Sequence, residues 1–344
     1  MEWFEGSGLY EGKLFYGSDP KLNGYNPNCE WFMNAKYGIS VGYLSHSVNA
    51  GVDFPERLTS MGKQTDWETC VNELDVQKCV DTLAKVQPGY VMLTMQQCDT
   101  HTCAPNATLD ALLGAKPGEN CSTRDLVIEF SDALKKYNIP LMLYVTADGM
   151  WKSPEAMSKL CEAEFPTDPS TFKAHHWTAA FKRKWFAAHR EWSMRYGDRI
   201  AGWWVDGADA CKGYSDVELL LFKQNLLAGN PNAIVTFNPG GDRFLPWRYS
   251  IADDYTAGES CDFDDYPEER WVNGAQWHEI SYLEAVTNRC AKDGSDPTEF
   301  MVNYVKAVTE KQGVLTIDFA LFRDGHLDED HLAIMRAVKE AVKG

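Results

Sequence analysis

The chain has 344 residues, of which 44% are apolar, and its 33 basic and 50 acidic side chains leave a net charge of −17. This charge opposes contact with nucleic-acid phosphates and anionic membrane surfaces, so we expect neither as a partner. No apolar run approaches the roughly 20 residues that a membrane-spanning helix needs.

The chain alternates between strand and helix patterns after an irregular lead-in, residues 1–30, that is rich in Gly, Asn, Tyr and Pro. The patterns predict strands at 38–43, 90–95, 139–145, 200–205, 233–237, 249–252, 275–280 and 314–319. They predict helices at 75–86, 123–136, 170–196, 216–228, 298–311 and 328–342. Because Gly and Pro form no linker cluster, we expect one domain over residues 1–344.

Eight strands joined by crossover helices predict a (β/α)₈ TIM barrel. The pattern is broken between strands five and seven, since only residues 242–248 separate strands five and six and 253–274 show no helical spacing. We therefore expect that side of the barrel to be irregular. An open doubly wound sheet is the alternative, but neither a Gly-x-Gly-x-x-Gly fingerprint nor a Gly-Lys-Ser/Thr phosphate loop follows any strand.

The stretch IAGWWVDGAD, residues 200–209, places an acid at the end of a buried strand. In a barrel, the carboxyl ends of the strands carry the active site, so Asp206 is our candidate nucleophile. The alternative is that Asp206 and Gly207 form an ordinary turn.

Residues near the ends of the other strands are of types that bind sugars. The candidate substrate-binding residues are Tyr43, His46, Gln97, Asp99, Tyr144, Trp151, Trp204, Asn238, Trp277, His278 and Glu279. Glycosidic hydrolysis needs two carboxyl groups flanking the bond, with other side chains holding the hydroxyls. Taken singly, several have a structural alternative: Trp277 as a core residue, His278 as a hydrogen-bonded core histidine.

No cofactor or metal site is predicted. The adjacent His175 and His176 lack a second ligand motif, and the acidic residues 262, 264 and 265 lack the full pattern of a calcium-binding loop. We expect an oligosaccharide or polysaccharide as the binding partner.

Ten cysteines, an even number without any Cys-x-x-Cys pair, favour disulfides and an extracellular location. Asn106 and Asn120 begin sequons for N-glycosylation. The first residues lack the pattern of a signal peptide, so we expect a secreted protein whose leader is missing from this sequence.

Several segments resemble the alpha-L-fucosidases of glycoside hydrolase family 29. The segments are AKYGISV (35–41), YVMLT (90–94), TRDLV (123–127), LMLY (141–144), WWVDG (203–207), QWHEISY (276–282) and QGVL (312–315) continuing to Gly325. The resemblance implies a TIM barrel and a retaining mechanism with Asp206 as the nucleophile. The segment DYTAGE (254–259) resembles the one that carries the acid/base in part of the family, which implies this role for Glu259, with Glu279 as the substitute.

The chain departs from the family at the sugar-binding positions. Where the family has His-Trp-Gly, His-His-Asp-Gly and Leu-Leu-Asn, this chain has GYL (42–44), QCDT (97–100) and LTID (315–318). The family's β-sandwich domain is also missing after the barrel. The resemblance thus implies a retaining exo-glycosidase for a terminal alpha-L-fucosyl or related sugar.

Two other functions remain open at this point. One is a carbohydrate-binding barrel without catalysis. The other is a polysaccharide lyase, or another glycosidase specificity, on the same scaffold, in which Arg243 or Arg248 approaches an acidic sugar.

Overall fold

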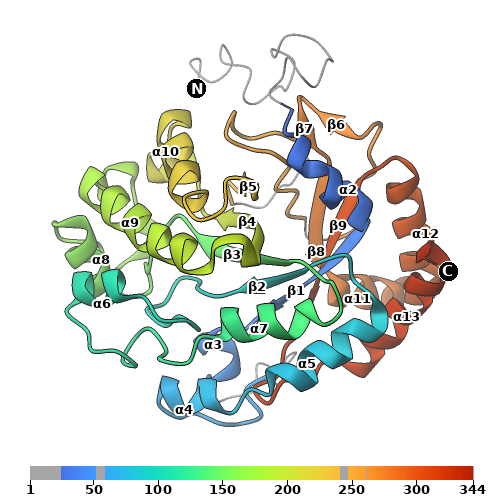
Figure 1. Ribbon diagram of the computed structural model, residues 1–344, viewed down its shortest axis with the longest axis horizontal. Helices are drawn as coiled ribbons and strands as arrows, with labels where there is room; N and C mark the ends of the chain where they lie inside the picture. Colours follow the sequence, from blue (N-terminus) through green and yellow to red (C-terminus); the bar gives the residue numbers. More distant parts are fainter. Residues whose placement is uncertain (1–24, 52–58, 241–246, 261, 344) are drawn as a thin grey trace.

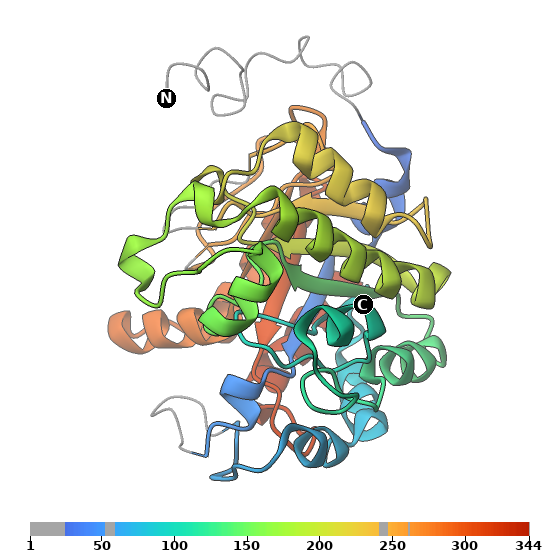
Figure 2. The ribbon, with the colours of Figure 1, turned by 90° about the vertical axis from the view of Figure 1, so that its left-hand side faces the viewer.

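The computed structural model describes residues 25–51, 59–240, 247–260 and 262–343. Its centre is a curved sheet of seven parallel strands in the order β5-β4-β3-β2-β1-β9-β8, surrounded by helices (Figures 1 and 2). The strands are β1 (Tyr37–Gly42), β2 (Val91–Thr94), β3 (Leu141–Thr146), β4 (Ile200–Asp206), β5 (Ile234–Phe237), β8 (His278–Tyr282) and β9 (Val314–Phe319). β6 (Trp271–Val272) and β7 (Ala275–Gln276) form a separate antiparallel ribbon.

The main helices begin at side chains that accept the first free backbone N–H groups. The helices are α2 (Glu30–Ala35), α3 (Ser45–Val48), α4 (Trp67–Asn72), α5 (Val76–Leu83), α6 (Ala107–Leu113), α7 (Leu126–Lys135), α8 (Pro154–Cys161), α9 (Ala179–Tyr196), α10 (Asp216–Leu226), α11 (Leu283–Asp293), α12 (Pro297–Glu310) and α13 (Glu329–Lys343). Asp, Asn, Ser or Thr caps most of them, as Asp75 does for α5 and Ser215 for α10. Within the described residues, no helix has the length and apolar character needed to cross a membrane.

Alternation along the strands separates an inner core from an outer one. Trp204 packs inside the curved sheet with residues such as Met142 and Ile234, whereas Trp203 packs outside, under the helices. Phe32 of α2 contacts Tyr90 and covers the inner core near the amino ends of the strands. Because side chains alternate, Asp206 lies on the inner face, two residues beyond Trp204.

The edge between β5 and β8 is bridged by an irregular segment, residues 254–260. The Asp254 N–H donates to Val235 O of β5, and the Ile280 N–H of β8 donates to Gly258 O. The buried carboxylates of Asp253 and Asp254 accept the backbone N–H groups of β5 at Phe237 and Val235, at 2.8 and 2.9 Å. These two carboxylates thus bind backbone N–H groups at the edge of β5 that a regular neighbouring strand would otherwise bind.

Six of the eight predicted strands are confirmed to within two residues. The strand predicted at 249–252 is wrong, because these residues form a bend and a turn that the side chain of Asp253 closes onto Ser250 N. The strand predicted at 275–280 is split between β7 and β8. A parallel α/β sheet is therefore confirmed, and so is the irregular side, while a closed barrel of eight regular strands is not shown.

The long helix predicted over 170–196 is shorter, since α9 begins only after Thr178 caps it. His46 and Ser47, which follow the first predicted strand, belong to the short helix α3.

Candidate functional site

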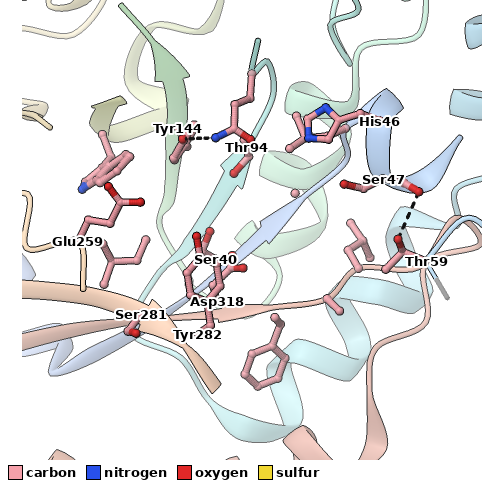
Figure 3. A pocket seen from close by; sticks show the side chains of 18 residues that line it. Ser40, His46, Ser47, Thr59, Thr94, Tyr144, Glu259, Ser281, Tyr282 and Asp318 are labelled. Carbon is pink, nitrogen blue, oxygen red and sulfur yellow. Dashed lines mark hydrogen bonds between the residues drawn. The ribbon is translucent and has the colours of Figure 1, made fainter. Parts of the chain in front are cut away.

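A cavity of about 180 Å³ lies at the carboxyl ends of the strands (Figure 3). Its wall includes Ser40 and Gly42 of β1, Thr94 of β2, Ser281 of β8 and Asp318 of β9. The register aligns these ends, because Gly42 pairs with Thr94 and Ser40 with Asp318. The sheet therefore collects polar side chains at one mouth, as expected for parallel strands.

Asp206 ends β4 and is held by three hydrogen-bond donors. The Tyr144 hydroxyl donates to Oδ2 at 2.6 Å. The Asn238 amide and the Gly207 N–H donate to Oδ1 at 2.8 and 2.7 Å. These three donors fix the orientation of the Asp206 side chain at the end of β4.

Glu259 lies beside Asp206 and shares a donor with it. The same Asn238 Nδ2 lies 2.5 Å from Glu259 Oε2, so Asp206 Oδ1 and Glu259 Oε2 are no more than 5.3 Å apart, the sum of the two hydrogen-bond distances. Burial, and then the negative charge of Asp206, raises the pKa of Glu259 to about 7. The pair thus joins a carboxylate to a carboxyl group that is partly protonated near neutral pH.

Asp206 and Asn238 do not themselves line this cavity, but a chain of contacts connects Asp206 with residues that do. The Gln97 amide donates to the Tyr144 hydroxyl at 2.7 Å, and this hydroxyl in turn donates to Asp206. The Tyr144 ring stacks on Trp204 with centroids 4.7 Å apart, and the Trp204 indole N–H donates to Ala257 O. Gln97, Tyr144 and Trp204 all line the cavity, so these sequence candidates meet in one place.

His46 and Asp99 lie on the side of the mouth formed by β1 and β2. His46 Nδ1 is 3.1 Å from Asp99 Oδ2, which also accepts the Ser45 hydroxyl at 2.7 Å. His46 lines the first cavity and also a second cavity beside it, whereas Asp99 lines only the second.

Four other candidates are not brought to the cavity. The buried Tyr43 hydroxyl donates to Cys70 O and Arg323 O. Trp151 packs edge-on against Phe172, and Trp277 lies in the outer core. His278 faces the inner core, where its ring is 2.7 Å from Thr316 Oγ1 and burial lowers its pKa to about 4. Trp277 is therefore a core residue and His278 a hydrogen-bonded core histidine, as in the structural alternatives to sugar binding.

Glu279 is also kept away from Asp206. It is fully buried and accepts the hydroxyl of Ser260 at 2.6 Å and the hydroxyl of Tyr304 on α12. Neighbouring Ile280 lines the cavity, so the alternation of β8 directs Glu279 to the outer, helical side. Among the described residues, Asp264, Asp265 and Glu279 form the group whose spacing could hold a metal ion, with ligand atoms within 4.8 Å of one another.

Sequence reasoning passed over part of the cavity wall and a buried ion pair. Ser40, Thr94 and Ser281 line the wall. The inner-face alternation of β1 and β2 could have indicated Ser40 and Thr94, whereas Ser281 alternates with the inner-facing Ile280. Lys212 Nζ lies 3.3 Å from Asp148 Oδ2, and burial raises the pKa of Asp148 to about 6 despite this contact. Lys212 ends a single turn of 3₁₀ helix, Ala210–Lys212, that is too short for a sequence period to mark it.

The expected disulfides are a wrong prediction for the cysteines that the structure describes. All nine are free thiols, and seven of them are buried as apolar side chains within the core. Cys261, the tenth, lies outside the described residues.

The predicted glycosylation is contradicted at Asn106. Its side chain is fully buried, caps α6 and donates to Ala188 O at 2.8 Å, so no amide is open to a glycan. Asn120 stays a prediction, as does secretion.

Of the two arginines expected of a lyase, the one that the structure describes, Arg248, does not line the cavity. Arg248 is buried, and its guanidinium donates to the carbonyls of Ser250, Ile251 and Asn273. Arg243 lies outside the described residues.

No protein-family model matches the sequence, and no curated protein matches it. Solved structures do match its fold. Alpha-L-fucosidase AlfC from Lactobacillus casei, in complex with alpha-L-fucose product, is 16% identical with a TM-score of 0.61, covering 92% of this chain and 98% of that one. Endo-fucoidan hydrolase MfFcnA4 from glycoside hydrolase family 107 is 16% identical with a TM-score of 0.61, covering 94% of this chain and 54% of that one. Alpha-L-fucosidase isoenzyme 1 from Paenibacillus thiaminolyticus is 14% identical with a TM-score of 0.59, covering 92% of this chain and 75% of that one. The chain therefore has the fold of these glycoside hydrolases.

Proposed function

We propose that the protein is a retaining glycoside hydrolase that releases a terminal alpha-L-fucosyl or related sugar unit. The observation that carries the proposal is the Asn238 amide, which lies within hydrogen-bonding distance of both Asp206 and Glu259. Retaining enzymes place their two carboxyl groups roughly 5–5.5 Å apart, whereas inverting enzymes leave roughly 6.5–9.5 Å for a water molecule. The limit of 5.3 Å between Asp206 Oδ1 and Glu259 Oε2 supports retention.

In the first step, Asp206 attacks the anomeric carbon and the glycosidic bond breaks. The carboxyl proton of Glu259 passes to the departing oxygen, which leaves a covalent glycosyl ester on Asp206. In the second step, Glu259, now a carboxylate, takes a proton from water as that water attacks the anomeric carbon. The ester bond breaks, Asp206 regains its charge, and the sugar keeps its configuration.

The electrostatics support this division of labour. Asp206 accepts three hydrogen bonds that orient it, whereas Glu259 accepts only one from the described residues and has a raised pKa that suits a general acid. Once Asp206 is esterified, its charge disappears and one cause of the raised pKa of Glu259 disappears with it. Glu259 then becomes the better base that the second step requires.

The sugar class is supported by the fold and by the stacked rings in the cavity. The solved structures of similar fold include proteins named alpha-L-fucosidase and endo-fucoidan hydrolase. Tyr144 and Trp204 offer an aromatic floor, and Gln97 offers an amide for hydroxyl groups. The changed segments GYL, QCDT and LTID leave a related sugar as the alternative to fucose.

A screen of aryl glycosides that includes aryl alpha-L-fucoside tests the proposal. We expect hydrolysis of at least one, with NMR showing the retained anomer as the first product. Asp206→Ala should lower kcat by several orders of magnitude, on the order of 10⁴-fold or more. Asp132→Ala, at an exposed aspartate on α7, is the matched control and should keep full activity.

Azide distinguishes the two roles. With Asp206→Gly, azide should replace the missing nucleophile and give a glycosyl azide of opposite configuration. With Glu259→Ala, azide should attack the glycosyl ester and give the retained configuration. Near-normal turnover of Asp206→Ala would refute the assignment, and sugar binding without any hydrolysis would favour the non-catalytic barrel.

A further inference from the structure

A second cavity opens beside the first, and His46 belongs to the walls of both. It has a volume of about 380 Å³. Its lining comes from α3 and the residues after it, from Gln64, from the segment after β2 and from Lys152 and Ser153 after β3. None of these residues except His46 lines the first cavity.

The second cavity lies across the mouth from the acid Glu259. Around the curved sheet, β1, β2 and β3 stand in sequence, followed by β4, which carries Asp206, then β5 and the segment with Glu259, then β8 and β9. The segment with Glu259 is therefore opposite β2. Figure 3 shows Glu259 and His46 on opposite sides of the first cavity.

This position decides which part of a substrate can reach the second cavity. Glu259 protonates the departing oxygen, so the leaving group extends from the Glu259 side of the scissile bond. The ring that Asp206 attacks fills the space between Glu259 and His46. Groups attached to the far side of that ring, on the glycone, point past His46.

The lining suits a neutral, hydroxyl-rich group. Gln64 and His101 offer an amide and an imidazole group, and the charges of Asp99 and Lys152 are opposite in sign. The Asp99 carboxylate also accepts hydrogen bonds from the Ser45 hydroxyl at 2.7 Å and from the backbone N–H of His101 at 2.9 Å. With no excess of positive charge, the cavity is built for a sugar and not for a sulfate or a phosphate.

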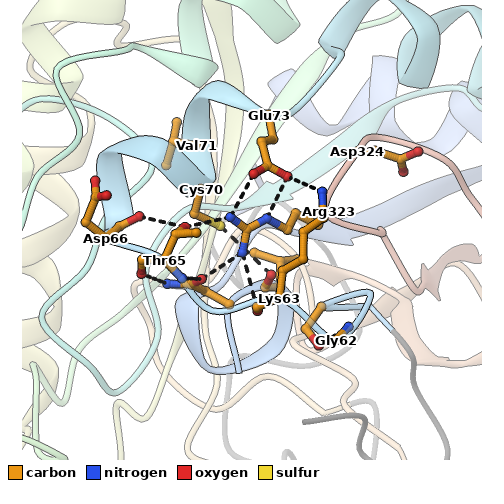
Figure 4. A network of polar contacts seen from close by, with 12 residues as sticks. Gly62, Lys63, Thr65, Asp66, Cys70, Val71, Glu73, Arg323 and Asp324 are labelled. Carbon is orange, nitrogen blue, oxygen red and sulfur yellow. Dashed lines mark hydrogen bonds and ion pairs between the residues drawn. The ribbon is translucent and has the colours of Figure 1, made fainter. Parts of the chain in front are cut away.

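A polar network around the buried Arg323 keeps this rim in place (Figure 4). The fully buried guanidinium of Arg323 donates to Glu73, to Asn49 Oδ1 at 2.8 Å and to Thr65 Oγ1 at 2.6 Å. Asn49 also exchanges two hydrogen bonds with the backbone of Thr65, next to Gln64. The wall is thus anchored without a ligand, which lowers the cost of binding one.

We infer that the second cavity binds a second sugar of the glycone, so that the unit released is a disaccharide. The inference rests on the proposed function and specifies its substrate. The first cavity takes the ring that reacts, and the second takes the sugar attached to the non-reacting side of that ring.

Paired substrates with the same aryl leaving group test the inference. One carries the monosaccharide that the screen identifies, and the other carries a disaccharide with that sugar at its reducing end. We expect kcat/KM to be at least tenfold higher for the disaccharide glycone. Failure of both substrates would count against the proposed function, whereas equal hydrolysis of both would overturn only the inference.

Variants at exposed residues of the second cavity locate the effect. Gln64→Ala and Lys152→Ala should each reduce the ratio of the two kcat/KM values several-fold. Lys135→Ala, at an exposed lysine on the outer face of α7, should leave the ratio unchanged. If the two cavity variants instead weaken only substrates with a longer leaving group, the second cavity binds the leaving group and the inference is wrong.

Discussion

Replacing Asp206 by Asn tests whether its charge sets the proton affinity of Glu259. Two unit charges 5.3 Å apart, the limit for these carboxylates, repel by about 0.8 kcal/mol in water and about 3 kcal/mol at an effective dielectric constant of about 20. At 1.36 kcal/mol for each pKa unit, this corresponds to roughly 0.6–2 units. Burial is the larger cause of the raised pKa of Glu259 and persists in the variant. We therefore expect that pKa to fall by about one unit, from about 7 to about 6.

The pKa can be read without activity from ¹³C NMR of protein labelled at the glutamate side-chain carboxyls, with Glu259→Gln used to assign the signal. Asp209→Asn is the matched control, because Asp209 also follows β4 but pairs with Lys212. A pKa of Glu259 that stays the same or rises in Asp206→Asn would refute the proximity of the two groups. In the wild type, kcat/KM should decrease as pH rises through about 7, where Glu259 loses its proton.

Three further changes have defined outcomes. Tyr144→Phe keeps the ring stack but removes a hydrogen bond to the proposed nucleophile, which contributes about 1.5–3 kcal/mol. The value of kcat/KM should therefore fall roughly 10- to 150-fold. An unchanged kcat/KM would exclude a role for the Tyr144 hydroxyl in holding Asp206. Gly207→Ala requires a side chain at φ +67° and puts a methyl carbon 2.7 Å from the Asp148 carboxyl, so denaturant unfolding should show a loss of about 1–3 kcal/mol. Gly114→Ala, at φ +68° with open space around it, should lose less, and equal losses would contradict the steric argument. Burial raises the pKa of Glu279 from 4.5 to about 8. Between these two pH values the unfolded chain loses the proton while the folded protein keeps it, so the free energy of unfolding decreases as pH rises. Glu279→Gln should therefore gain stability relative to the wild type from the lower to the upper end of the window, and a constant difference would disprove this.

The regular part of the fold could be predicted from sequence because its strands are buried on both faces. Continuous apolar runs such as residues 141–145 mark these strands, and capping residues such as Asp75 and Ser215 mark helices. The segment between β5 and β8 could not be predicted in the same way. There, Asp253 and Asp254 are buried and bind backbone N–H groups, a use of acidic residues that resembles a solvated turn when only the sequence is seen.

Candidate residues predicted from sequence meet at the site only where they lie near a strand end and alternation also places them on the inner face. Asp206, Tyr144 and Gln97 lie at or near the ends of inner-facing strands and meet as expected. Glu279 did not, because it alternates with the inward-facing His278 and Ile280, which turns its carboxyl toward α12. Trp277, two residues earlier, also packs in the outer core, so the alternation of the segment could have indicated the position of Glu279.

Asn238 links the geometry of the site to its chemistry. Two carboxylates held this close resist joint ionisation, so one proton is shared unequally between them. The amide donates to both, but Tyr144 and Gly207 add donors only to Asp206. The raised pKa of Glu259 therefore favours a proton on this residue before any substrate arrives. Esterification of Asp206 removes the repulsion and releases Glu259 to act as a base, so that one hydrogen-bonded pair can serve both halves of a retaining reaction.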